Sequence, residues 1–169
     1  MRKRKLAGIG VLLGVTALLF GGCNEKEAPQ KLRVGVTYYD QNDTYLNELI
    51  GLFKESLKEI ESDKLEVSVT IRDAAGVQKN QNDQVEELID EGCNILCVNL
   101  VDRADPSEII DLARESEVPI IFFNREPVAE DLRQWEKLYY VGADAKQSGK
   151  LQGELAVEMI EENPQIDKN

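Results

Sequence analysis

The chain has 169 residues, of which 32 are acidic and 20 are basic, and it contains no histidine. The net charge of −12 opposes binding to nucleic acid or to anionic lipid headgroups, because like charges repel. Without histidine, the chain lacks the residue most often used near neutral pH as a general base or metal ligand.

The first 23 residues are typical of a bacterial export signal. Basic residues at positions 2–5 precede an apolar run, Leu6 to Phe20, and then Gly21-Gly22-Cys23. The run is shorter than the ~20 residues of a membrane-spanning helix. The pattern resembles a lipobox, which predicts a lipoprotein signal peptide over residues 1–22, lipidation of Cys23 and a polar tether over residues 23–31. An ordinary signal followed by a chance cysteine is the alternative. The protein is therefore expected to be exported, and either lipid-anchored to the outer face of the cell membrane or periplasmic.

The rest of the chain alternates strand-like and helix-like segments. Apolar or alternating runs predict strands over residues 32–37, 65–71, 95–98, 119–123 and 139–141. Helical periodicity predicts helices over residues 45–61, 77–91, 106–116 and 145–162, with Asp43 or Thr44 capping the first. We therefore predict an α/β fold, a doubly wound parallel sheet of order 2-1-3-4-5 with helices on both faces. A ligand is expected beyond the carboxyl ends of its strands.

Two pairs of residues are expected to have structural roles. Cys93 and Cys97 are interpreted as small core side chains on one face of a strand, ~13 Å apart and too distant for a disulfide. Asn99 and Asp102 follow the third strand, where loop bracing and capping are expected. We predict neither a metal site nor a cofactor for this part of the chain.

Polar and aromatic side chains follow the first and fourth strands. The first loop contains Tyr39, Asp43 and Tyr45 and has no glycine, so it does not match a phosphate-binding loop. Aromatic faces beside carboxylates and amides suit a neutral polyol, although Tyr38 and Tyr45 also suit packing in the core or at the start of a helix. Asn124 offers a donor and an acceptor where a buried strand emerges, or it forms a turn.

Several blocks of the chain resemble the galactose/glucose-binding group of the type I periplasmic binding proteins, the sugar receptors of ABC transporters. The similarity covers almost all of residues 32–162, in the blocks VGVTYYDQNDTYLNEL, QKNQNDQVEELIDEGCNILCVNLVD, VPIIFFNREP and YYVGADAKQSGKLQGELA. It implies that residues 32–169 form an N-terminal sugar-binding lobe. The second lobe, with the calcium site expected in it, is absent from this sequence.

The resemblance also implies roles for four side chains. Asp43 matches a carboxylate that accepts hydrogen bonds from sugar hydroxyls, and Asn124 matches an amide of the same wall. Tyr45 replaces an aromatic, usually phenylalanine, that stacks on a pyranose face, and Tyr39 matches a tyrosine near the ligand. The implied partners are galactose or glucose and the permease of an ABC transporter. Since a single wall leaves much of the sugar surface exposed to water, we expect at best millimolar binding.

Two other classes of function are compatible with this fold. An enzyme on this fold would use Asp40 and Asp43 as a carboxylate pair, but the sequence has no histidine, and neither a nucleophile elbow nor a phosphate-binding loop supports catalysis. We therefore expect no enzymatic activity. A chemosensory or partner-docking sugar receptor lobe, without a role in transport, is the alternative to an import function.

Overall fold

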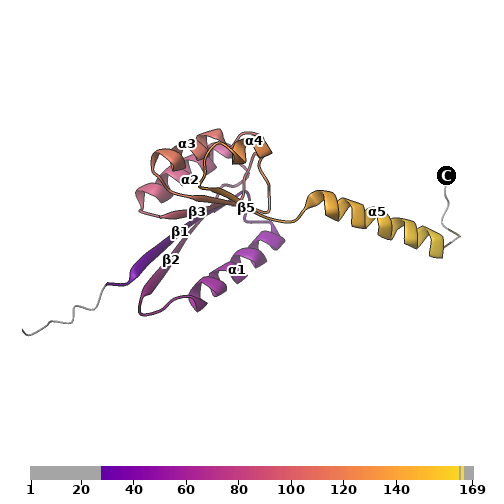
Figure 1. The fold of residues 1–169 in the computed structure, drawn as a ribbon, viewed down its shortest axis with the longest axis horizontal. Helices are drawn as coiled ribbons and strands as arrows, with labels where there is room; N and C mark the ends of the chain where they lie inside the picture. The colour runs from indigo at the N-terminus through magenta and orange to yellow at the C-terminus, as the bar shows by residue number, and fades with distance from the viewer. Residues whose placement is uncertain (1–27, 164, 166–169) are drawn as a thin grey trace, which may run out of the picture.

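The computed structural model describes residues 28–163 and 165. Five strands alternate with five helices (Figure 1): β1 (Gln30–Tyr38), α1 (Thr44–Glu59), β2 (Leu65–Asp73), α2 (Gln78–Asp90), β3 (Ile95–Val98), α3 (Ser107–Glu115), β4 (Ile120–Phe123), α4 (Ala129–Leu132), β5 (Leu138–Val141) and α5 (Ala145–Glu162). The predicted signal peptide, Cys23 and most of the predicted tether lie outside the described residues. Within residues 28–163, no helix combines the length and apolar character that crossing a membrane requires.

The five strands form one parallel sheet of order β2-β1-β3-β4-β5, which confirms the predicted topology. Parallel neighbours need crossover connections, and the helices provide them. α2, α3 and the short α4 lie on one side of the sheet and α1 lies on the other (Figure 1). The crossovers bring the carboxyl ends of the strands to one edge of the sheet, where the candidate site residues follow.

The larger core cluster lies between the sheet and α2 and α3. Its fully buried members include Leu88, Ile109, Ile120 and Phe122. Gly35 of β1 faces this cluster, and a Cβ atom there would approach the side chains of Leu96, Cys93 and Leu88 to 3.0–3.2 Å. A residue without a side chain at this position therefore allows α2 to pack closely on the sheet.

The prediction that Cys93 and Cys97 share one face of the sheet is wrong. Cys93 packs in the cluster under α2 and α3, whereas Cys97 packs with Val34 and Val36 on the α1 side. The reason is local, because Gly92 has a φ of 83° and turns the chain after α2, so that β3 begins only at Ile95. Both thiols are free and buried, and burial raises the pKa of Cys97 to about 11.

The last helix has the predicted bounds but does not cover the sheet. α5 extends away from the body of the fold (Figure 1), and none of its residues is buried. The α1 side of β5 consequently has no helix packed on it in the described part of the chain, whereas Phe123 of β4 packs against Leu46 and Ile50 of α1. The expectation of helices on both faces thus holds for β1 and β2 but not for this end of the sheet.

Candidate functional site

Asp43 lies at the junction of β1 and α1 and is fixed by two hydrogen bonds. Its Oδ1 accepts from the backbone N–H of Leu46 at 3.0 Å, which makes Asp43 the N-cap of α1 as predicted. Its Oδ2 accepts from the Tyr39 hydroxyl at 2.5 Å. These hydrogen bonds hold the pKa of Asp43 below its ordinary value, and the hydrogen bond from Tyr39 has the larger effect. The side chain is therefore an ionised acceptor with a fixed orientation.

Tyr39 connects the loop after β1 to the loop after β4. Its hydroxyl donates to Asp43, and the same hydrogen bond raises the pKa of Tyr39. The guanidinium of Arg125 lies over the Tyr39 ring, 4.9 Å from the ring centroid, a cation–π arrangement. Arg125 was not predicted to be a site residue from the sequence, although it directly follows Asn124 in the loop.

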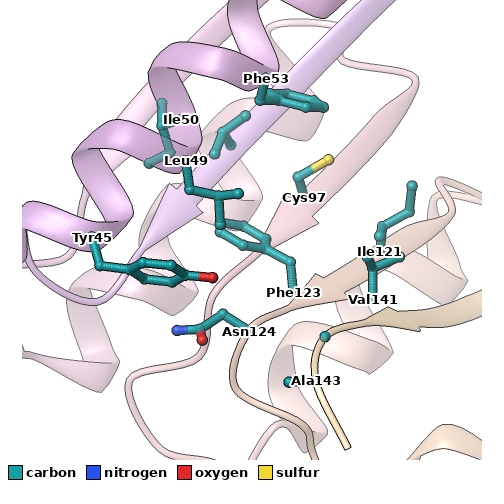
Figure 2. A pocket seen from close by; sticks show the side chains of 12 residues that line it. Tyr45, Leu49, Ile50, Phe53, Cys97, Ile121, Phe123, Asn124, Val141 and Ala143 are labelled. Carbon is teal, nitrogen blue, oxygen red and sulfur yellow. The ribbon is translucent and has the colours of Figure 1, made fainter.

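Asn124 occupies the turn at which β4 ends. Its φ of 60° is in the left-handed region, which asparagine adopts more readily than most residues. Its backbone N–H donates to the carbonyl of Val141 at 3.0 Å, and its carbonyl accepts from the Tyr140 hydroxyl at 3.3 Å. The turn and ligand interpretations are thus compatible, because the backbone forms the turn while the exposed amide points outward at the groove (Figure 2).

A groove of about 430 Å³ runs along the α1 side of the sheet, which is within the usual size range of ligand pockets. Tyr45 and Asn124 lie beside each other at one end, and Phe53 lies at the other (Figure 2). Most of the lining is apolar: Val36, Leu49, Ile50, Phe53, Cys97, Ile121, Phe123 and Val141. The groove therefore has a polar, aromatic mouth at the carboxyl edge of the sheet and an apolar floor.

The structure gathers the four predicted residues at one edge of the sheet. Tyr45 and Asn124 line the groove itself. Asp43 and Tyr39 lie beside it, joined to each other by a hydrogen bond and to the Asn124 loop through Arg125.

Asn99 and Asp102 have the expected bracing roles. The Asn99 side-chain amide donates to the carbonyl of Phe123 at 3.0 Å, and Asp102 Oδ1 accepts from the Ala104 N–H at 2.8 Å. Asn99 thereby ties the end of β3 to the end of β4. Neither side chain lines the groove.

The side chains at the mouth can recognise a neutral, hydroxylated ligand. Asp43 supplies an ionised acceptor, Asn124 supplies a donor and an acceptor, and Tyr45, which is 62% exposed, offers a ring face. Within the described residues, no group of three or more acidic or cysteine side chains is arranged to hold a metal ion. The chemistry is that of binding through one ring and a few oxygen and nitrogen atoms.

The amino-acid sequence is similar to a known protein family over most of its length. The family described as periplasmic binding protein domain matches residues 34–167. The D-galactose/methyl-galactoside binding periplasmic protein MglB of Haemophilus influenzae is 36% identical over 137 residues, which are 81% of this chain and 40% of the relative. The chain thus spans about 40% of the length of that curated relative.

Solved structures show the same fold. An ABC transporter solute binding protein from Bacillus halodurans, with bound myo-inositol, is 26% identical with a TM-score of 0.66, and the match covers 80% of this chain and 44% of that one. An ABC transporter solute binding protein from Clostridium phytofermentans, with bound β-D-glucose, is 20% identical with a TM-score of 0.65. The match covers 76% of this chain and 37% of that one. At 20% identity the likeness concerns the fold alone. In both cases the chain corresponds to less than half of the structure.

Proposed function

The chain belongs to the periplasmic binding protein domain family, and from this membership we propose that it is a sugar-binding component of an ABC importer whose described residues supply one wall of the sugar site. The proposed ligand is a monosaccharide of the galactose or glucose type. The named relative binds D-galactose and methyl-galactoside. The mouth of the groove carries the ring face of Tyr45 and the amide of Asn124, and the carboxylate of Asp43 lies two residues before Tyr45 at the start of α1.

The observation that carries this proposal is that Tyr45 and Asn124 lie together at one end of the groove (Figure 2), with the fixed carboxylate of Asp43 two residues before Tyr45. A pyranose ring lying on Tyr45 would direct its edge hydroxyls at the Asn124 amide and the Asp43 carboxylate. The hydroxyl that distinguishes Tyr45 from phenylalanine lies at the ring edge, so the stacking face is retained.

One wall sets the expected affinity. Clefts that bind sugars tightly bury most of the ligand and remove its water, whereas this mouth leaves the opposite face of the sugar in solvent. We therefore propose millimolar binding by the 169-residue chain. The assay is a titration with galactose or glucose followed by ¹H–¹⁵N NMR, in which the backbone signals of Tyr45 and Asn124 should shift at millimolar sugar.

Two variants of Tyr45 test the stacking role. Tyr45→Phe retains the ring and should bind as the parent does, whereas Tyr45→Leu should lose the shifts without unfolding, because the side chain is mostly exposed. Sugar-dependent shifts confined to other loops would contradict the proposed site. Micromolar affinity would contradict the one-wall geometry.

We further propose that the protein is exported, lipidated at Cys23 and bound to the outer face of the membrane, where it would meet the permease. The export pattern in residues 1–23 and the family membership support this proposal. Metabolic labelling with a radioactive fatty acid should mark the parent chain and not Cys23→Ala. Co-purification with the permease would separate import from a purely sensory role.

A further inference from the structure

The backbone at Asn124 is closed into a tight turn. Asn124 has a φ of 60°, and the backbone N–H of Arg125 donates to the carbonyl of Phe123 at 2.6 Å across it. A three-residue turn with this hydrogen bond and a positive φ has the features of a classic γ-turn, which is rare and strained. Strained turns persist only where their surroundings hold them, and they gather at functional sites. The contacts that hold this turn therefore bear on the groove, which Asn124 lines.

The first of these contacts comes from Asn99, which directly follows β3. Its Nδ2 donates to the Phe123 carbonyl at 3.0 Å, so this carbonyl accepts one hydrogen bond from inside the turn and a second from Asn99. Asn99 is fully buried, and within the described residues its Oδ1 has no hydrogen-bond partner. A buried oxygen without a partner is unfavourable. The side chain therefore serves the fold through its N–H donor, and this donor acts on the peptide that precedes Asn124.

The second contact comes from Tyr140 of β5. Its hydroxyl donates to the Asn124 carbonyl at 3.3 Å, and it lies directly against Gly142, where a Cβ atom would collide with the hydroxyl. A residue without a side chain at position 142 thus leaves the space in which the Tyr140 hydroxyl reaches the turn. The peptides on both sides of Asn124 are consequently held by side chains from the two neighbouring strand ends.

We propose that Asn99 and Tyr140 are positioning residues, which hold the strained turn and thereby direct the Asn124 amide into the groove (Figure 2). With the peptide planes on both sides of Asn124 fixed, its φ and ψ are set, and with them the direction of its side chain. Neither Asn99 nor Tyr140 lines the groove, so each acts through Asn124. This inference rests on the proposed function, because the direction of the amide matters for binding only if a sugar contacts it.

The turn itself is measured by NMR without sugar, from the one-bond coupling between Cα and Hα of Asn124, which distinguishes a positive φ from a negative one. Asn99→Leu keeps the branching of the side chain and removes both its donor and its unpartnered oxygen. The melting temperature should therefore stay close to that of the parent, while the coupling moves toward the value of a negative φ. Asn94→Leu is the matched control, because Asn94 donates to the Lys31 carbonyl at 2.6 Å from the other end of β3. It should leave the coupling unchanged.

Two substitutions test the second contact independently of Asn99. Tyr140→Phe removes the hydroxyl, and Gly142→Ala displaces it from the Asn124 carbonyl, so both should move the coupling in the same direction. Tyr139→Phe is the matched control, because Tyr139 lies in the same strand but is 54% exposed, and it should leave the coupling unchanged.

Galactose gives the second readout. The side-chain amide signals of Asn124 should shift with millimolar galactose in the parent chain, and this shift should be lost in Asn99→Leu and in Tyr140→Phe. An unchanged coupling in Asn99→Leu or in Tyr140→Phe would overturn the role of that residue, and unfolding of Asn99→Leu would show that Asn99 is structural instead. A parent chain that does not respond to galactose would contradict the proposed function, whereas the coupling, measured without sugar, still decides whether these residues hold the turn.

Discussion

Gln81 of α2 makes two hydrogen bonds, one buried and one partly buried, whose loss should destabilise the carboxyl edge of the sheet. The side chain is fully buried. Its Nε2 donates to the carbonyl of Asn99 at 2.9 Å, and its Oε1 accepts from the backbone N–H of Val101 at 2.8 Å. These bonds hold the chain as it leaves β3. Gln81→Leu nearly retains the volume of the side chain but leaves both backbone groups without their partners.

The expected cost follows from these two groups. A buried polar group without a partner costs about 1–3 kcal/mol, and the partly buried Val101 N–H costs somewhat less, so Gln81→Leu should lower the free energy of unfolding by about 2–5 kcal/mol. For a chain of this size the melting temperature should fall by roughly 5–15 °C. Urea unfolding followed by circular dichroism should show a lower midpoint with an unchanged slope.

Gln78→Leu is the matched control for this prediction. Gln78 lies one turn earlier on α2 and accepts from the backbone N–H of Asp102 at 2.8 Å, but it is only half-buried. Water can replace that bond, so the loss should be about 0.5–1 kcal/mol. The reasoning would be refuted if Gln81→Leu were no more destabilising than Gln78→Leu.

Two further predictions concern the candidate site and the core. Because its pKa is lowered in the folded chain, Asp43 contributes stability that is present at neutral pH and lost as the pH falls through that lowered pKa. Tyr39→Phe removes the main cause, so the pKa of Asp43 should move up toward its ordinary value; NMR titration of its carboxyl carbon measures this, and an unchanged pKa would contradict it. Gly35→Ala should cost about 1–3 kcal/mol, since the new Cβ meets Leu96, Cys93 and Leu88. Gly51→Ala in α1, where nothing lies within 4 Å, should add about 0.5–1 kcal/mol, and urea unfolding of both variants showing the same sign would refute the contrast.

The sheet order and most element bounds were predictable because the strands and helices have distinct apolar periods. β3 and α5 have the predicted limits, and Asp43 caps α1 as its residue type indicates. β1 begins two residues before the predicted strand, because Gln30 and Lys31 pair with Leu65 and Glu66 of β2. The short α4 was not predicted, since four residues are too few to show a helical period.

The features that could not be predicted from the sequence depend on where the chain turns in three dimensions. The faces of Cys93 and Cys97 depend on the turn at Gly92, which interrupts the strand period before β3. The position of Arg125 over Tyr39 depends on the left-handed backbone of Asn124 immediately before it. The direction of α5 depends on the three residues, 142–144, that join it to β5.

The double anchoring of Asp43 has a consequence for how a ligand would arrive. The start of α1 and the Tyr39 hydroxyl set the position of the carboxylate while the chain folds, so this acceptor is preorganised and loses little freedom when a ligand binds. Mutational scans of the mouth will therefore mix two effects at position 43, since a variant that weakens binding also releases the first turn of α1. Asn124→Asp changes the amide but tolerates the left-handed φ of 60° at this turn, so this variant separates recognition from folding more cleanly.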